Sequence, residues 1–152
     1  MNALLLPTIE FGPLILKRII EQLGQYQLDM RLDPNRFSPR EVVAHLADWE
    51  PIMRERVRIA AEQPGTVLEV FDEEEMARAH GYEHSDVMEE CDKFIRERAI
   101  TAAYMRTLDT AGWSGMTTHP ERGPQSAENL ANTILSHDMY HLEQLSAYLA
   151  AK

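Results

Sequence analysis

The sequence predicts an all-α protein: a four-helix bundle with a short extra helix in the connection between the second and third long helices. Two observations predict this fold. Apolar residues recur in steps of three and four along four stretches, as on the buried face of an amphipathic helix. The chain has 152 residues, which suits one core of ordinary size. We therefore expect a single bundle domain over residues 1–152.

The first helix is expected over residues 8–24. Gly24 favours a stop at its C-terminal end. Pro13 allows two starts, because it suits the first turn of a helix that begins near Gly12 and can also lie inside a helix that begins at Thr8. Both starts leave one apolar stripe facing inward, formed by Leu16, Ile19, Ile20 and Leu23.

The second long helix opens with a specific signature at Ser38. This residue can cap the helix, Pro39 suits the first helical position, and Glu41, three residues after the cap, completes a capping box. The face that follows is formed by Val42, His45, Leu46, Trp49, Ile52 and Met53. His45 is therefore expected among core residues.

The helical pattern breaks between residues 62 and 84. Pro64 and Gly65 mark a turn, and Asp72 followed by three glutamates predicts the capped start of a short acidic helix that ends near Gly81. Consecutive acidic positions point all round a helix, so we interpret them as a solvated first turn and not as metal ligands. A connection of this length also lets the chain cross over the bundle, so the long helices need not alternate in direction.

The third long helix is expected from about Ser85 to Leu108. Cys91 falls on its apolar face, and we interpret it as a small buried residue because a reactive thiolate needs exposure and a cationic neighbour. Residues 109–125 are rich in Gly, Pro and Thr and are expected to form a loop. The last helix, residues 126–152, follows, and Ser126 can cap it.

His137 and His141 lie four residues apart in the last helix, so both imidazoles share one face. They continue the inward ridge formed by Leu130, Ile134, Leu145 and Tyr148. Two buried imidazoles need partners, which can be backbone or hydroxyl groups of the core or one metal ion. The pair lacks the glutamate of a HExxH motif, so a metal site requires a third ligand.

Composition excludes several classes of function. The formal net charge is −10 and the basic residues are scattered, so we expect no binding to nucleic acid or to an anionic membrane surface. The apolar run at the N-terminus is too short for a signal or membrane-spanning segment. One cysteine excludes an internal disulfide, which favours a reducing, cytoplasmic location.

In a bundle, His45 can supply the third ligand to the last-helix pair. Three imidazoles from two helices leave room for water or substrate, a pattern typical of catalytic centres, and zinc and nickel suit such ligands. Asp48 and Asp138 are placed to orient an imidazole or to accept a proton, although a solvated acid or a surface ion pair explains each equally well.

The segments SPREVVAHLADWEP at 38–51 and HDMYHLEQL at 137–145 resemble the DinB/YfiT-like family of metalloenzymes, and the resemblance extends over essentially the whole chain. In that family a histidine of the second helix and an HxxxH pair of the last helix bind one divalent metal ion. The resemblance implies this role for His45, His137 and His141. It also implies hydrolysis or transfer of a low-molecular-weight thiol, since a divalent ion makes hydroxide or thiolate available at neutral pH.

We therefore expect a metal-dependent transferase or hydrolase that acts on a small-molecule substrate. The alternative is a non-catalytic bundle, stabilised by metal or free of it, that acts by association with other proteins. A homodimer is expected in either case, and the eight methionines would suit an adaptable interface. A structural metal site should be closed and needed for folding, whereas a catalytic site should be open and dispensable for folding.

Overall fold

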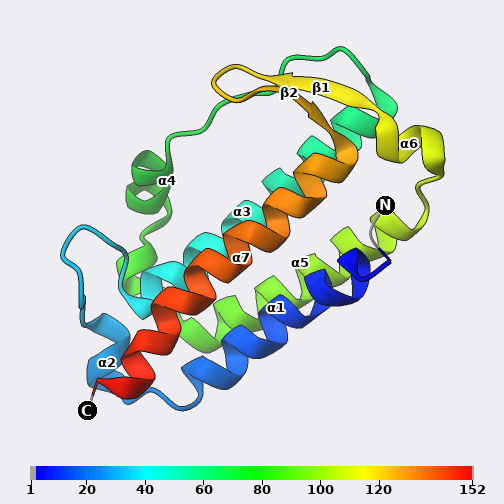
Figure 1. Ribbon diagram of the computed structural model, residues 1–152. Coiled ribbons are helices and arrows are strands. Elements are labelled where there is room, and N and C mark those ends of the chain that lie inside the picture. Colours follow the sequence, from blue (N-terminus) through cyan, green and yellow to red (C-terminus); the bar gives the residue numbers. More distant parts are fainter. Residues whose placement is uncertain (1–2, 152) are drawn as a thin grey trace.

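The computed structural model describes residues 3–151, and four long helices form a bundle (Figure 1). The long helices are α1 (Leu5–Ile20), α3 (Pro39–Glu62), α5 (Val87–Arg106) and α7 (Ala127–Ala150). The shorter elements are α2 (Gln25–Asp29), α4 (Glu73–His80), the 3₁₀ helix η1 (Tyr82–His84), α6 (Thr110–Ser114), β1 (Met116–His119) and β2 (Gly123–Ser126). The predicted four-helix bundle, with an extra helix before the third long helix, is confirmed.

The long helices do not alternate in direction. α3 and α5 pack together and run the same way, whereas α1 and α7 pack together and run the opposite way (Figure 1). Contacts of α1 with α5 and of α3 with α7 complete the bundle. The chain returns along the bundle between α3 and α5, through residues 63–86, and α4 lies on this crossover. The crossover that the length of this connection allows is therefore present.

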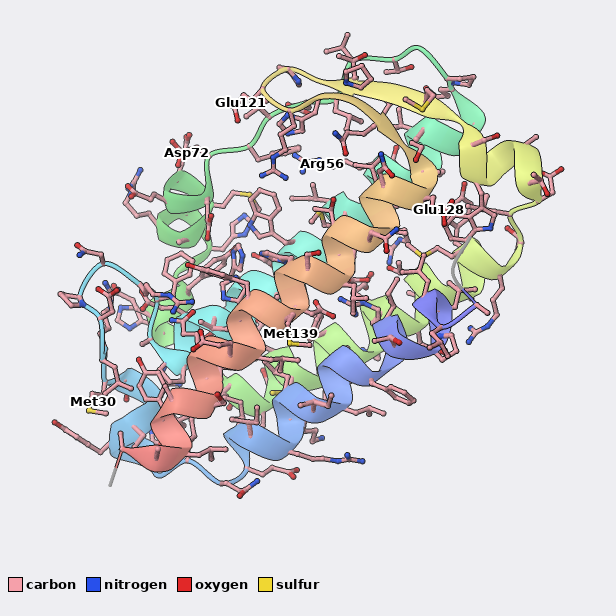
Figure 2. All side chains as sticks on the ribbon, in the orientation of Figure 1. Met30, Arg56, Asp72, Glu121, Glu128 and Met139 are labelled. Carbon is pink, nitrogen blue, oxygen red and sulfur yellow. The ribbon has the colours of Figure 1, made fainter. Side chains whose placement is uncertain are left out.

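Side-chain caps fix the starts of α3, α4 and α7 at the predicted residues. Ser38 Oγ accepts the Glu41 N–H at 3.3 Å, and Glu41 Oε2 accepts the Ser38 N–H at 2.8 Å, which closes the capping box. Asp72, labelled in Figure 2, caps α4 by accepting the Glu75 N–H, and Ser126 caps α7 by accepting the Asn129 N–H. Gly81 ends α4 with a φ of +62°, a conformation that glycine adopts without strain.

The predicted ends of the first helix were wrong. α1 begins at Leu5 and ends at Ile20, and Gly24 starts α2 instead of stopping α1. Pro13 lies inside α1, where it cannot donate a hydrogen bond to the Ile9 carbonyl one turn earlier. That carbonyl accepts the Arg98 Nη1–H at 2.6 Å instead, so a side chain from α5 replaces the hydrogen bond that proline removes.

The loop predicted over residues 109–125 contains regular structure. α6 is followed by an antiparallel pairing of β1 with β2, in which Thr117 lies opposite Gln125. The backbone of the α3–α5 connection pairs with β1, because the Leu68 N–H donates to the Thr118 carbonyl at 2.9 Å. The hairpin thus ties the crossover connection to the start of α7.

Two apolar clusters form the core. The first includes Leu5, Ile9, Val57, Trp113 and Ile134. The second includes Leu16, Val43, Cys91, Phe94 and Leu145. The buried side chains of Glu50, Arg98 and Asp138 lie between the two clusters along their helices. Cys91 is fully buried and burial raises its thiol pKa to about 12, so the interpretation of Cys91 as a core residue is confirmed.

A membrane-spanning segment was not expected. Within residues 3–151, none of the helices has both the length and the apolar character that crossing a bilayer requires.

Candidate metal centre

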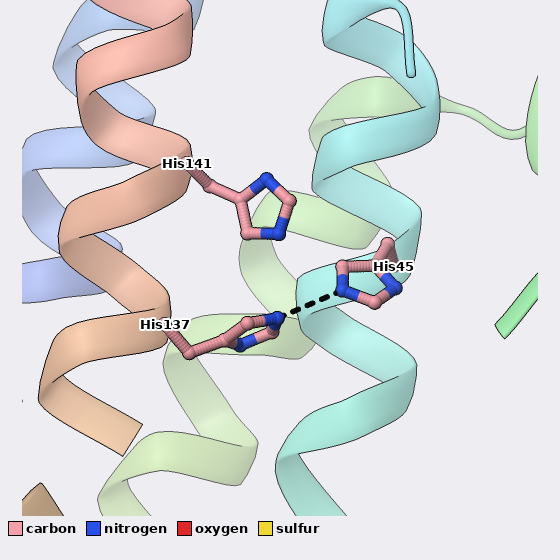
Figure 3. Close-up of side chains that lie close together, drawn as sticks. All are labelled: His45, His137 and His141. Carbon is pink, nitrogen blue, oxygen red and sulfur yellow. Dashed lines mark hydrogen bonds between the residues drawn. The ribbon is translucent and has the colours of Figure 1, made fainter. Parts of the chain in front are cut away.

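The three histidines that the sequence singled out meet between α3 and α7 (Figure 3). His45 comes from α3, and His137 and His141 come from successive turns of α7. Each offers one nitrogen, and these nitrogens all lie within 4.8 Å of one another. The closest pair, Nε2 of His45 and Nε2 of His137, are 2.9 Å apart. His45 is only 1% exposed and His141 only 4%, whereas His137 is partly exposed, so the cluster is accessible mainly at His137.

The environment keeps all three imidazoles uncharged near neutral pH. Burial lowers the pKa of His45 from its ordinary 6.5 to about 2, and the nearby His137 and His141 add to this effect. Burial also lowers the pKa of His137 to about 3 and that of His141 to about 4. A neutral imidazole has one nitrogen with a free lone pair, which is the form that binds metal ions.

The donor set and its spacing fit one divalent ion. Zinc holds imidazole nitrogens at about 2.0–2.1 Å, so two ligands of a tetrahedral ion lie about 3.4 Å from each other. The separations between the three nitrogens, 2.9 Å for the closest pair and at most 4.8 Å, bracket this value. His45 Nδ1 is buried and has no hydrogen-bond partner within residues 3–151, but Figure 3 shows this nitrogen on the side of the ring that faces away from His137 and His141, so the ligand that His45 offers is Nε2. The three histidines could therefore hold a metal ion.

Gln144 fixes the orientation of His141. Its amide Nε2–H donates to the Phe37 carbonyl at 2.7 Å, so its Oε1 faces His141 Nδ1 at 3.3 Å. Because Oε1 can only accept, the Nδ1 of His141 carries the proton and Nε2 carries the lone pair. Gln144 was not predicted from the sequence, although an amide on the inward face one turn after His141 indicates such a role.

One residue of the acidic turn of α4 reaches the cluster. Glu73 Oε1 lies 3.6 Å from His45 Nε2, and the Glu73 side chain is 51% exposed. Burial raises the pKa of Glu73, and the neighbouring Glu74 and Asp72 raise it further. Glu73 is thus exposed, in agreement with the interpretation of the acidic run as a solvated turn, and the crossover connection also brings it to the mouth of the site.

The two aspartates proposed as supporting groups have other partners. Asp48 accepts hydrogen bonds from Lys93 Nζ and His80 Nδ1, each at 2.5 Å. Asp138 pairs with Arg98 through two hydrogen bonds of 2.6 and 2.9 Å. No hydrogen bond within residues 3–151 joins either carboxylate to the three histidines, and Asp138 is 3% exposed, so it is no solvated acid.

Two cavities open beside the cluster and share Glu73, His137 and Tyr140. One has a volume of about 320 Å³ and is lined by His45, Trp49, Met53, Arg56, Glu73, Arg122, Thr133, Ser136, His137 and Tyr140. The other has a volume of about 340 Å³ and is lined by Asn35, Arg36, Phe37, Glu73, Glu74, His137, Tyr140, His141 and Gln144. A group held by the histidines would therefore face space large enough for a small molecule.

Comparison with known proteins agrees with the geometry. The sequence matches the DinB superfamily over residues 14–145, a range that contains all three histidines. The chain belongs to the DinB superfamily. The predicted family resemblance is thereby confirmed.

This DinB protein is also similar to two individual proteins. One, from Oceanobacillus iheyensis, carries the name "putative metal-dependent hydrolase" and is 24% identical over 145 residues, which cover 95% of this chain and 83% of the relative. The other is the structure of YfiT from Bacillus subtilis, described as "a probable metal-dependent hydrolase with an unusual four-helix bundle topology". It superposes with a TM-score of 0.88 at 20% identity and covers 95% of this chain and 83% of YfiT. The two proteins therefore share one fold.

Proposed function

We propose that this DinB protein is a metal-dependent hydrolase in which His45, His137 and His141 hold one divalent ion, zinc or nickel. The observation that carries the proposal is the convergence of three uncharged imidazoles next to two cavities. Three protein ligands leave a coordination position free, which is typical of a catalytic site and not of a closed structural one. The descriptions of the two similar proteins as metal-dependent hydrolases support the same class of reaction.

A bound divalent ion would lower the pKa of water and polarise the bond to be hydrolysed. The protein supplies the surroundings. Glu73, at the mouth of the site, is placed to accept a proton from an attacking water molecule, because its carboxylate lies 3.6 Å from His45 Nε2. Trp49 and Tyr140 wall the cavity in which the substrate would lie.

The proposal also covers a thiol as the attacking group. A coordinated thiol loses its proton even more readily than water, so the same free position would serve transfer of a low-molecular-weight thiol. The presence of two cavities that both border His137 supports this second reaction, because a thiol and an electrophile need separate space.

Metal analysis of the purified protein tests the proposal. We expect close to one zinc or nickel ion per chain, and we expect its loss in His45→Ala, His137→Ala and His141→Ala. Exchange of His84 for alanine is the matched control, because the His84 side chain is 82% exposed and is not one of the three clustered histidines, and this variant should keep its metal. Circular dichroism checks that each variant is folded.

Activity is then measured with p-nitrophenyl acetate, in the presence and absence of a low-molecular-weight thiol. We expect turnover by the metal-loaded protein, loss of turnover in the three histidine variants, and reduced turnover with metal retained in Glu73→Gln. A wild-type protein that stays free of metal when zinc or nickel is supplied contradicts the proposal. A protein that unfolds when its metal is removed identifies a structural site instead.

A further inference from the structure

Arg56 is a buried cation that no carboxylate of the described chain neutralises. The side chain extends from α3 into the wall of the 320 Å³ cavity and is only 7% exposed. Its Nη2 donates to the Glu69 carbonyl at 3.1 Å, its Nη1 lies 3.9 Å from Met53 Sδ, and its Nε has no partner. A buried charge without a counter-ion is costly in a folded protein, and an anionic ligand would remove this cost.

Two aromatic rings lie beside the guanidinium group of Arg56. Arg56 Cζ lies 5.6 Å from the centre of the Trp49 ring and 6.0 Å from that of Phe71. Aromatic rings at these distances stabilise a guanidinium and limit its rotation. A planar guanidinium recognises the paired oxygens of a carboxylate or a phosphate, so this arrangement favours an oxyanion.

A second arginine adds positive charge at the same cavity. Arg122, in the turn between β1 and β2, is exposed and lines the cavity together with Arg56, and no ion pair within residues 3–151 involves it. Burial lowers the pKa of Arg56, and the charge of Arg122 lowers it further, so the two cations act on each other. Figure 2 shows Arg56 on the side of the bundle where the start of α4 and the hairpin turn lie, marked by Asp72 and Glu121.

We propose that the substrate of this site carries an oxyanion group, a carboxylate or a phosphate, which Arg56 binds and Arg122 steers inward. The inference rests on the proposed function, because it places this group in the cavity that His45 and His137 also line. Arg56 and Arg122 outnumber the one carboxylate of this cavity, Glu73, so the cavity favours anions although the chain has a net charge of −10. Arg56 and Arg122 thus define the class of substrate, and the histidines define the reaction.

Binding of benzoate to metal-free protein tests this inference separately from the metal. Benzoate offers a carboxylate to Arg56 and a ring to Trp49 and Tyr140, and benzamide is its uncharged counterpart of the same shape. Dissociation constants come from ligand-detected NMR titrations after the metal is removed and the chelator is dialysed away. We expect benzoate to bind at least about ten-fold more tightly than benzamide, since a hydrogen bond to a charged group contributes that much. Inorganic phosphate is titrated in parallel, and tighter binding of phosphate would assign the group as phosphoryl.

Three single substitutions test which arginine binds the carboxylate of benzoate. Arg56→Gln should weaken benzoate binding about ten-fold or more, and Arg122→Gln about two- to three-fold, because Arg122 is exposed. Arg58→Gln removes the same charge from the same helix, but Arg58 pairs with Glu55 and Glu62 on the surface, so binding should not change. Equal binding of benzoate and benzamide to the wild-type protein would overturn the inference, whether or not Arg56→Gln folds. Equal binding of benzoate to folded Arg56→Gln and wild type would do the same, and the metal result would stand in both cases.

Discussion

Two buried polar clusters lie side by side in this bundle, and they differ in how completely the chain satisfies them. Both draw side chains from α3 and α7, and His137 and Asp138 are consecutive residues that belong to different clusters. The first cluster joins Glu50, Arg98 and Asp138, and the second joins the three histidines. The charge of Arg98 contributes to the low pKa of His137, which shows how close the two clusters are.

The arginine cluster is closed, in the sense that the chain supplies a partner for each of its polar groups. Arg98 makes two hydrogen bonds of 2.8 Å to Glu50, two to Asp138 and one to the Ile9 carbonyl that Pro13 leaves free. Burial alone would lower the pKa of Arg98, but hydrogen bonds to Asp138 and attraction to Glu50 outweigh burial and raise it. Every group in this cluster has a partner from the chain itself, as expected of a structural element.

The histidine cluster is open. Its imidazoles contact one another, yet His45 Nδ1 has no partner in the described chain, and two cavities adjoin the cluster. Five of the six side chains in the two clusters are buried and only His137 is partly exposed, so burial alone does not separate structural polar groups from functional ones. The difference lies in the partners that the chain supplies and in the adjoining space, because each group of the Arg98 cluster has a partner in the chain, whereas the histidines border two cavities from which a ligand can reach them.

The largest expected effect comes from breaking the closed cluster with Arg98→Met. The exchange leaves the carboxylates of Glu50 and Asp138 buried without a counter-ion, so we expect the free energy of unfolding to fall by about 3–5 kcal/mol. Urea denaturation followed by circular dichroism measures this change. Arg96→Met, an exposed position on the same helix, serves as the control and should change stability by less than about 0.5 kcal/mol. Equal losses in the two variants would contradict the structural role of Arg98.

A smaller effect is expected from the loss of Gln144, the residue that orients His141. Gln144→Ala removes the acceptor that orients His141, so we expect the affinity for zinc to fall about 10- to 100-fold while the protein stays folded. Competition with a chromophoric chelator measures this affinity. Gln22→Ala, at an exposed position, provides the baseline.

Gln144→Glu separates the two roles of this side chain. A carboxylate still accepts the His141 Nδ1–H but cannot donate to the Phe37 carbonyl. We expect this variant to bind zinc more tightly than Gln144→Ala. If both variants keep the affinity of the wild type, Gln144 serves the packing of the chain around Phe37 and not the orientation of His141.

The parts of the fold that follow local rules could be predicted from the sequence. The capping box at Ser38 and Glu41 depends on residues within one turn, and the four-residue spacing of His137 and His141 places both on one face in any helix. His45 can approach that pair only if the long helices pack as a bundle, and their apolar periodicity predicted this packing.

Features that depend on distant residues could not be predicted. Arg98 lies on the apolar stripe of α5, four residues after Phe94, but its carboxylate partners come from two other helices. β1 pairs with the connection near Leu68, and a four-residue strand carries too weak a pattern to reveal such a partner. The approach of Glu73 to His45 follows from the path of the crossover, which residue spacing does not encode.

The smallest expected effect concerns Asp48, whose exposure is intermediate between a buried cluster and the surface. Burial alone would raise the pKa of this carboxyl, but hydrogen bonds from Lys93 and His80 outweigh burial and lower the pKa below its ordinary value. An acid with a lowered pKa stabilises the fold at pH values above its unfolded pKa of about 3.9, and this contribution is lost as the pH falls through the folded value.

Asp48→Asn should therefore lower the free energy of unfolding by about 1 kcal/mol at pH 7, and the difference from the wild type should shrink below about pH 4. Urea denaturation at pH 7, 5 and 3.5 measures both values. Asp92→Asn is the control, because the pair of Asp92 with Lys17 is exposed and should contribute less. A difference that stays constant down to pH 3.5 would show that shape and not charge matters at Asp48. The contacts of Asp48 in α3 with Lys93 in α5 and His80 in α4 would then stabilise the fold through packing, whereas the Arg98 cluster depends on complete neutralisation of charge.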